Sequence, residues 1–189
     1  ANDRQYVFHS WSAQGAIDPL PVAKGEGVRF WDYDGKEYLD FSSQLVNLNL
    51  GHQHPGLVQA IQDQAGRLAT IQPAFANDVR GELAKRIVER SFPGARSVFF
   101  TNGGADANEY AVRMARHHTG RQKVLARYRS YHGPTATAIT LTGEPRRWAN
   151  GVLDPFVVHF TGPYAYRSAF YAETPEQETE RALAHLEQT

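Results

Sequence analysis

The sequence contains no cysteine among its 189 residues. A disulfide framework, a zinc site built on thiolates and a cysteine nucleophile are therefore all excluded. The absence is also consistent with a reducing compartment.

An excess of charge of one sign is missing as well, because 20 basic residues balance 20 acidic ones. No bulk positive field exists to gather nucleic acid or an anionic membrane, so we expect neither as a partner. Lysine is scarce, and the four lysines can each be considered separately.

Long hydrophobic runs are absent too. No stretch approaches the roughly 18–20 apolar residues of a membrane-spanning helix, and no apolar segment follows residues 1–4. We therefore expect no signal peptide and a soluble, cytoplasmic protein. Hydrophobic residues make up 41% and aromatic residues 12% of the chain, which is enough for a packed core and excludes wholesale disorder. The length favours one domain or slightly more.

The first third of the chain predicts a β-hairpin over residues 25–41. Apolar and polar residues alternate in Val28–Asp32 and again in Glu37–Phe41, and Asp34-Gly35 lies between them. Asp-Gly between two alternating runs is the strongest short-range signal for a hairpin turn.

Apolar residues at helical spacing predict two helices, near 56–69 and at about 78–91. A break that contains His52 and His54 precedes the first of them. The two histidines could form half of a metal site or a turn that caps the helix. No third histidine or carboxylate lies nearby in the sequence, so we expect the capping turn and no metal.

From residue 97 the pattern becomes strand, turn, helix and strand. Ser97–Thr101 predicts a strand buried on both faces, 105–118 a helix, and Lys123–Ala126 the next strand. Such a βαβ unit predicts a parallel sheet with helices packed on it. The residues that we expect to face inward on the helix are Ala107, Tyr110, Ala111, Met114 and Ala115.

The last part of the chain carries weaker signals. Residues 133–142 fit either a helix or a strand, and 143–172 reads as a loop with one short apolar piece. Thr174-Pro175-Glu176-Gln177 predicts the start of a C-terminal helix. It combines a threonine cap, a proline at the first helical position and a glutamine that can close a capping box.

The turn between the predicted strand and helix is the first candidate site. Backbone N–H groups and the positive end of the helix dipole converge there, and Gly103 and Gly104 let an anion approach the backbone. The turn therefore predicts a phosphate cradle formed by Gly103, Gly104, Ala105 and Asp106. Alternatively, the two glycines only allow a tight turn. No Lys-Ser/Thr follows Gly104, which argues against a nucleoside triphosphate.

Tyr131 and His132 form the second candidate site, because they follow the next predicted strand. Ligands of open parallel sheets bind at the carboxyl ends of the strands. Tyr131 could stack on a flat cofactor and His132 could donate a hydrogen bond to it. The alternative is a buried tyrosine that anchors a loop.

Several segments, in shared order and spacing across about residues 25–143, resemble the class III aminotransferases. The hairpin resembles the opening of that family, and Gly51–Pro55 resembles its Gly-His-x-His-Pro turn. Thr101–Glu109 resembles its Thr-Asn-Ser-Gly-Ser-Glu-Ala-Asn-Glu stretch, and Tyr131-His132-Gly133 completes the match.

The resemblance implies an α/β protein with the fold type I of transferases that depend on pyridoxal 5'-phosphate (PLP). We expect a partial large domain, with a mostly parallel sheet and flanking helices, preceded by an N-terminal β-hairpin segment. Residues 1–55 would be that segment, part of the small domain, and residues 56–189 would be part of the PLP-binding large domain. The resemblance also implies a homodimer or a larger oligomer.

Site residues follow from the same resemblance. The backbone at Gly104 and Ala105 would hold the PLP phosphate, and Tyr131 would stack on the pyridine ring, with His132 nearby. Asp106 stands where the family has a glutamate. Gly103 and Ala105 replace small hydroxyl residues, so the phosphate loses hydroxyl partners but keeps the main-chain donors.

Trp11 and Val46 fall at positions that line the substrate pocket in this family. Residues 41–47 and 9–14 look most like the branch that contains taurine–pyruvate and related ω-amino acid aminotransferases. The implied reaction is transamination of an amine or ω-amino acid with a keto acid acceptor such as pyruvate.

Two residues that the family needs are missing: the Schiff-base lysine and the aspartate on the pyridine nitrogen. None of the four lysines matches the family's position; they are Lys24, Lys36, Lys85 and Lys123. We therefore expect an incomplete part of the enzyme that is inactive by itself. The alternatives are a non-catalytic truncated subunit, a phosphate-binding module, or another fold-type I PLP enzyme such as an aminomutase or a lyase.

Overall fold

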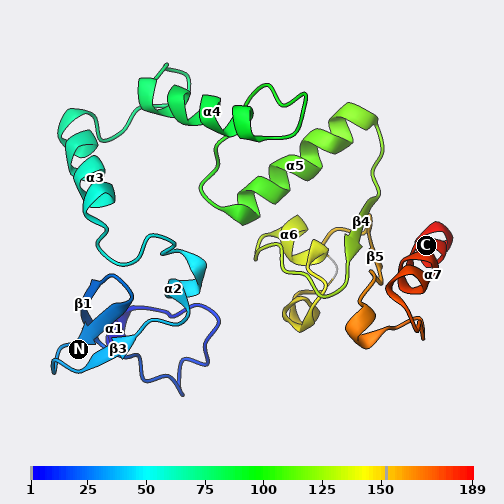
Figure 1. Cartoon of the computed structure of the whole chain (residues 1–189), viewed down its shortest axis with the longest axis horizontal. Coiled ribbons are helices and arrows are strands. Elements are labelled where there is room, and N and C mark those ends of the chain that lie inside the picture. Colours follow the sequence, from blue (N-terminus) through cyan, green and yellow to red (C-terminus); the bar gives the residue numbers. More distant parts are fainter. Residues whose placement is uncertain (1, 152) are drawn as a thin grey trace. The chain divides into compact units, whose positions relative to one another are not determined.

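The computed structural model describes residues 2–151 and 153–189, and the chain divides into two compact units, Ala1–Gly81 and Glu82–Thr189. Within the described part of the chain, no helix combines the length and the apolar character needed to cross a membrane. The elements, shown in Figure 1, are α1 (Asn2–Tyr6), β1 (Val22–Glu26), β2 (Arg29–Asp32), β3 (Glu37–Leu39), α2 (Ser43–Val46), α3 (Pro55–Arg67), α4 (Asp78–Arg90), α5 (Gly104–Thr119), β4 (Val124–Arg127), α6 (Ala136–Leu141), η1 (Pro145–Asn150), β5 (Val157–Phe160), η2 (Ala165–Arg167) and α7 (Pro175–Gln188).

The first unit contains the predicted hairpin. Strands β2 and β3 pair in antiparallel fashion, with Arg29 opposite Leu39, and Gly35 in the turn has a φ of 82°. The buried carboxylate of Asp32 closes the turn by accepting hydrogen bonds from the backbone N–H of Lys36 at 2.9 Å and from the hydroxyl of Tyr38 at 2.9 Å. The third strand, β1, was not predicted, because its sequence VAKGE does not alternate in polarity.

Both helices predicted before residue 92 are confirmed as α3 and α4. The ring Nδ1 of His54 accepts a hydrogen bond from the backbone N–H of Leu57 at 3.4 Å, so the predicted capping turn is also confirmed. The apolar side chains of both helices remain largely uncovered, as Ile61, 61% exposed, illustrates.

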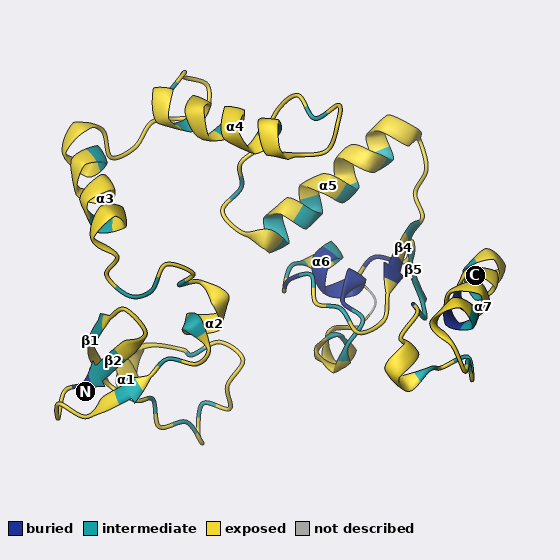
Figure 2. Ribbon diagram, in the orientation of Figure 1, coloured by how far each residue is buried: buried dark blue, intermediate teal, exposed yellow. Residues whose placement is uncertain are grey.

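The core of the second unit lies around α6 and the parallel pair β4–β5. In this pair Val124 lies opposite Val157 and Arg127 opposite Phe160. The segment that fitted helix or strand is the helix α6, and Figure 2 shows it as the most buried element. The buried hydrophobic residues of the described chain are Ala126, Ala138, Ile139, Leu141 and Ala182.

The prediction of a strand at Ser97–Thr101 is wrong for this chain. The segment is irregular, and the parallel partner of β4 is β5 rather than an earlier strand. A strand exists only where a neighbour supplies ladder hydrogen bonds, and none of the described residues pairs with this segment. It packs on α5 instead, with the ring centroids of Phe99 and Tyr110 4.8 Å apart.

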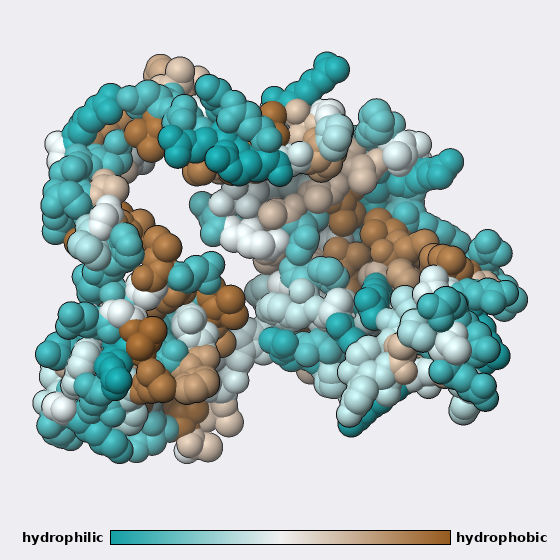
Figure 3. Space-filling model, viewed as in Figure 1, coloured by the Kyte–Doolittle hydropathy of each residue, from teal (hydrophilic) through white to brown (hydrophobic). Residues whose placement is uncertain are grey.

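The prediction of the buried face of α5 is also wrong. The expected inward residues are exposed, and Met114 has half of its surface accessible. The opposite face, which carries Asn108, Glu109 and Arg116, is half-buried. Polar contacts with α6 and the segment before β5 fix that face, whereas in the described residues the apolar face stays largely exposed apart from the contact of Tyr110 with Phe99. Figure 3 shows such apolar side chains at the surface of both units.

The predicted start of the C-terminal helix is confirmed as α7. The hydroxyl of Thr174 accepts a hydrogen bond from the backbone N–H of Gln177 at 3.3 Å. The side chain of Gln177 accepts from the N–H of Glu173 at 3.1 Å, one residue before the position of a standard capping box.

Candidate cofactor site

The N-terminus of α5 has the geometry of an anion site. Gly103 precedes the helix in extended conformation, and no side chain of the described residues caps this end. The backbone N–H groups of Gly104, Ala105 and Asp106 therefore belong to an uncapped first turn of a 16-residue helix. A Cβ added at Gly103 or Gly104 would meet no atom within 4 Å, so the space above the turn is open. This open, uncapped turn fits a phosphate group.

The second predicted segment lies directly against this turn. Gly133 has a φ of 125°, and a Cβ built on it would lie 2.5 Å from the Cβ of Ala105 and 2.8 Å from its Cα. The side-chain amide of Asn108 donates a hydrogen bond of 2.7 Å to the carbonyl of His132. The structure thus brings together the two segments that sequence analysis singled out separately.

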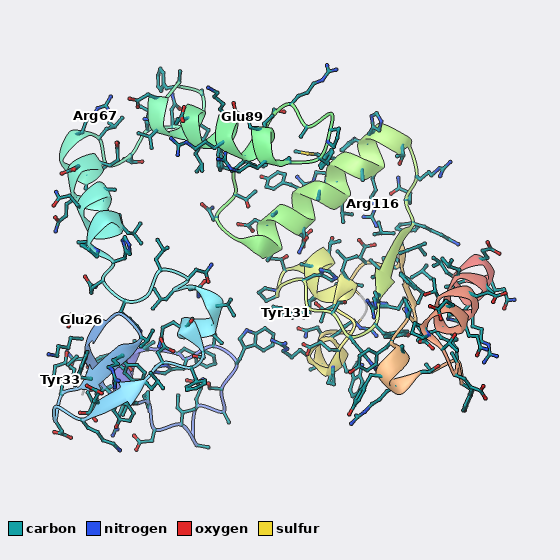
Figure 4. The ribbon with its side chains drawn as sticks, viewed as in Figure 1. Glu26, Tyr33, Arg67, Glu89, Arg116 and Tyr131 are labelled. Carbon is teal, nitrogen blue, oxygen red and sulfur yellow. The ribbon has the colours of Figure 1, made fainter. Side chains whose placement is uncertain are left out.

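Tyr131, labelled in Figure 4, and His132 directly precede Gly133 in the chain. The backbone N–H of His132 donates to the hydroxyl of Thr142 at 3.0 Å, which fixes the loop. The ring of Tyr131 is partly exposed, and the guanidinium of Arg146 lies 4.1 Å from its centroid. The sequence shows Arg146 only as one of a pair of arginines, which predicts a solvated loop or an anion contact and not this contact with the ring of Tyr131.

Glu109 connects α5 to α6, a role that sequence analysis did not predict. Its carboxylate accepts hydrogen bonds from the hydroxyl of Thr135 at 2.7 Å and from the backbone N–H groups of Thr137 at 2.7 Å and Ala138 at 3.2 Å. It therefore caps the N-terminus of α6 from a different helix. Burial raises the pKa of Glu109, but these hydrogen bonds outweigh it, so the pKa lies below its usual value. In the sequence Glu109 is only one acidic residue near the start of a helix.

The capping role of Glu109 predicts a dependence of stability on pH. Because the folded-state pKa lies below the unfolded one, the stabilisation is complete above the unfolded value of about 4.3 and disappears as the pH falls through the folded value. We expect Glu109→Gln to lower the free energy of unfolding at pH 7 by about 1 kcal/mol and to flatten its decline below pH ~4.3. Urea unfolding of both proteins over this pH range measures the difference. Parallel pH profiles for the two proteins would contradict the assignment.

Arg116 and Asp154 fix the other end of α5. The guanidinium forms a two-pronged pair with the buried carboxylate, at 3.0 and 3.1 Å, and its Nε donates to the carbonyl of Gln122 at 2.8 Å. Burial raises the pKa of Asp154, but the bonds from Arg116 and from the N–H of Phe156 outweigh it and lower the pKa. Figure 4 shows Arg116 between α5 and the strands. The pair ties the C-terminal half of α5 to the segment that precedes β5.

Trp11 and Val46, the predicted pocket residues, lie in the first unit, whereas the predicted cofactor residues lie in the second. Both side chains are exposed, and both residues have a positive φ, 57° for Trp11 and 66° for Val46. Their role in a substrate pocket stays a prediction.

The lysines lie outside the two site segments. Lys24 and Lys36 lie over the rings of Trp31 and Tyr38, at 4.7 and 4.9 Å from the centroids. Lys85 pairs with Glu89 at 3.8 Å on the exposed side of α4, and Lys123 directly precedes β4. Among residues 2–151 and 153–189, no group of three or more His, Asp or Glu side chains is arranged to hold a metal ion.

Comparison with known proteins identifies the family. Residues 12–189 match the family model of aminotransferase class III. The chain is 42% identical over 150 residues to acetylornithine aminotransferase from Caldanaerobacter subterraneus. The aligned part is 76% of this chain and 37% of the relative. It is 37% identical over 163 residues to acetylornithine aminotransferase from Streptomyces coelicolor. In this case the aligned part is 82% of this chain and 39% of the relative.

Solved structures agree in fold. Taurine:2-oxoglutarate aminotransferase from Bifidobacterium kashiwanohense, in complex with PLP and glutamate, matches with a TM-score of 0.92 and 42% identity over 99% of this chain and 43% of its own. The omega transaminase from Pseudomonas jessenii, in complex with PMP, matches with a TM-score of 0.91 and 29% identity over 99% of this chain and 44% of its own. The chain thus spans less than half of the length of each relative. It belongs to the class III aminotransferases, a family of fold-type I proteins that depend on PLP.

Proposed function

We propose that this chain supplies the phosphate-binding turn, the ring-stacking tyrosine and part of the substrate pocket of a transaminase. The enzyme would move an amino group from an amine or ω-amino acid to a keto acid such as pyruvate. The observation that carries the proposal is the contact of Gly133 with Ala105, which joins the loop of Tyr131 to the uncapped N-terminus of α5. The names of the taurine and omega transaminase neighbours support the class of donor.

When bound, PLP supplies a pyridine ring that accepts the electron pair left behind as a proton leaves the donor carbon. The N–H groups of Gly104, Ala105 and Asp106 bind the phosphate, aided by the dipole of α5. The ring of Tyr131 would stack on the pyridine, and His132, whose backbone is fixed by Asn108 and Thr142, would lie beside it.

The proton carrier of this reaction is a lysine, which has to lose its proton in a desolvated site beside the cofactor. The lysines of this chain lie on aromatic rings, on the outside of a helix or at the amino end of β4. We therefore propose that the Schiff-base lysine and the aspartate on the pyridine nitrogen lie outside residues 1–189, and that these residues alone are inactive.

We also propose that the enzyme is a homodimer or a larger oligomer. In the part of the chain that the structure describes, the apolar side chains of α3, α4 and α5 are largely exposed, and large exposed apolar surfaces favour association. The parts of these apolar faces that the second subunit does not cover would be covered by the remainder of the enzyme.

The stacking of Tyr131 on the cofactor gives the direct test of this function. We expect Tyr131→Ala in the intact protein to weaken PLP binding by about 2- to 10-fold, the equivalent of one aromatic stacking contact, and to shift the absorption of bound PLP. Tyr131→Phe keeps the ring and should retain most of the affinity. Titration with PLP, followed by absorbance, measures both variants. Equal losses in the two variants would indicate a role of the hydroxyl group, and no loss in either would exclude stacking.

A further inference from the structure

The segment α2 is a strained left-handed turn. Ser43, Gln44, Leu45 and Val46 have φ values between 47° and 66°, and none of them is glycine. In this region the Cβ of an L-residue approaches the following carbonyl oxygen, and the branched side chain of Val46 makes the conformation least favourable there. Such strain persists only when surrounding contacts hold it in place, and it is concentrated at functional sites.

The carboxylate of Asp40 is the group that holds this turn. It accepts hydrogen bonds from the hydroxyl of Ser42 at 3.3 Å and from Gln44, whose backbone N–H lies at 3.4 Å and whose side-chain amide lies at 3.1 Å. His52 reaches the same carboxylate with its Nε2 at 2.8 Å. The side chain of Asp40 is only 4% exposed and that of His52 16%. The acceptor is thus nearly buried, although the turn that it holds is at the surface.

His52 is in turn fixed to the sheet of the first unit. Its backbone exchanges two hydrogen bonds with Gly27, at 3.0 and 2.7 Å. Its ring lies so close to the sheet that a Cβ at Gly25 would be 2.6 Å from its Nδ1. The contacts therefore run without interruption from the sheet through His52 and Asp40 to the turn.

We propose that Asp40 and His52 are positioning residues, which hold Ser43–Val46 in the left-handed form and thereby present Leu45 and Val46 to the amine substrate. These two side chains are 85% and 75% exposed. The inference rests on the proposed function, in which Val46 lines the substrate pocket. Without the carboxylate the turn relaxes toward right-handed or extended backbone, and the side chain of Val46 changes direction.

The test compares Asp40→Ala with the double variant Asp40→Ala/Gln44→Gly in the intact protein. In the Asp40→Ala protein the side-chain amide of Gln44 no longer has the Asp40 carboxylate as its acceptor. Replacing Gln44 by glycine there removes only the cost of a left-handed backbone at a residue with a side chain. Asp34→Ala, at an exposed position of the hairpin turn, is the matched control. We expect Asp40→Ala to raise KM for the amine about tenfold, as for one lost hydrogen bond to a charged group, with PLP content unchanged. The double variant should recover part of this loss, because glycine relieves one of the four left-handed residues, and the control should not change KM.

Amide hydrogen exchange gives a readout that does not depend on activity. The N–H groups of Val46, Asn47 and Leu48 donate to the carbonyls of Ser42 and Ser43. They should lose protection in Asp40→Ala and regain it in the double variant. Unchanged protection, or an unchanged KM in an active enzyme, would overturn the inference alone. A rise in KM together with equally large losses of kcat and PLP content, and without rescue by glycine, would show that Asp40 has only a structural role. That result would also overturn the inference. A wild-type protein that binds no PLP and transfers no amine would overturn the proposed function, and the substrate role of the turn with it.

Discussion

Gly104→Val is expected to abolish the retention of PLP by the intact protein. The phosphate oxygens have to approach the N–H groups of the first turn of α5 to within about 2.9 Å, and the valine methyl groups would fill the open space above that turn. Losing two hydrogen bonds to a charged group, at about 1.5 kcal/mol each, weakens binding by at least ~100-fold. The absorbance of PLP that remains after desalting measures the effect.

The fold itself tolerates this change. The φ of Gly104 is not positive, and a Cβ on it meets no protein atom within 4 Å. Gly66→Val is the matched control, because Gly66 also lies in a helix and its Cβ would also meet nothing within 4 Å. We expect this control to keep its PLP. A Gly104→Val protein with undiminished cofactor content would show that the phosphate is bound elsewhere.

Features decided by neighbours in the chain were predictable from the sequence. The hairpin turn at Gly35, the cap of α3 by His54 and the cap of α7 by Thr174 are all present. In each case a residue's own conformational preference, or a hydrogen bond to a residue three positions away, decides the structure. The two site segments were also found from local patterns: a glycine pair between apolar residues and a helix marks the turn at Gly103-Gly104, and Tyr131 and His132 follow a predicted strand.

Features decided by distant partners were not predictable. Ser97–Thr101 has the composition of a strand, but a strand needs a partner for its ladder hydrogen bonds, and none of the described residues pairs with this segment. Which face of α5 is covered depends on residues that are distant in the sequence. The covered face is the polar one, and contacts such as the capping of α6 by Glu109 hold it in place. Hydrophobic periodicity finds the apolar face of a helix, but it does not show whether another element covers that face.

The contact between Gly133 and Ala105 also depends on distant partners, because the two residues are adjacent only in the folded chain. Gly133→Ala should therefore have the largest effect on stability in this region. The new methyl group would lie 2.5 Å from the Cβ of Ala105, and the φ of 125° disfavours any side chain. Overpacking and backbone strain each contribute about 1–3 kcal/mol, so we expect the free energy of unfolding to fall by more than about 2 kcal/mol.

A second substitution separates the clash with the Cβ of Ala105 from the other causes. Ala105→Gly removes the closest atom from the path of the new methyl group, and by itself it should cost at most about 1 kcal/mol through helix propensity. The double variant should lose less stability than the sum of the two single losses, because the clash with the Cβ of Ala105 disappears, whereas the approach to its Cα at 2.8 Å and the backbone strain remain. PLP affinity should follow the same order, since the loop of Tyr131 moves away from the N-terminus of α5 only when the two residues collide. Denaturant unfolding and PLP titration of the four proteins measure both effects. Strictly additive losses would mean that the new methyl group does not collide with the Cβ of Ala105 and that this contact does not hold the site together.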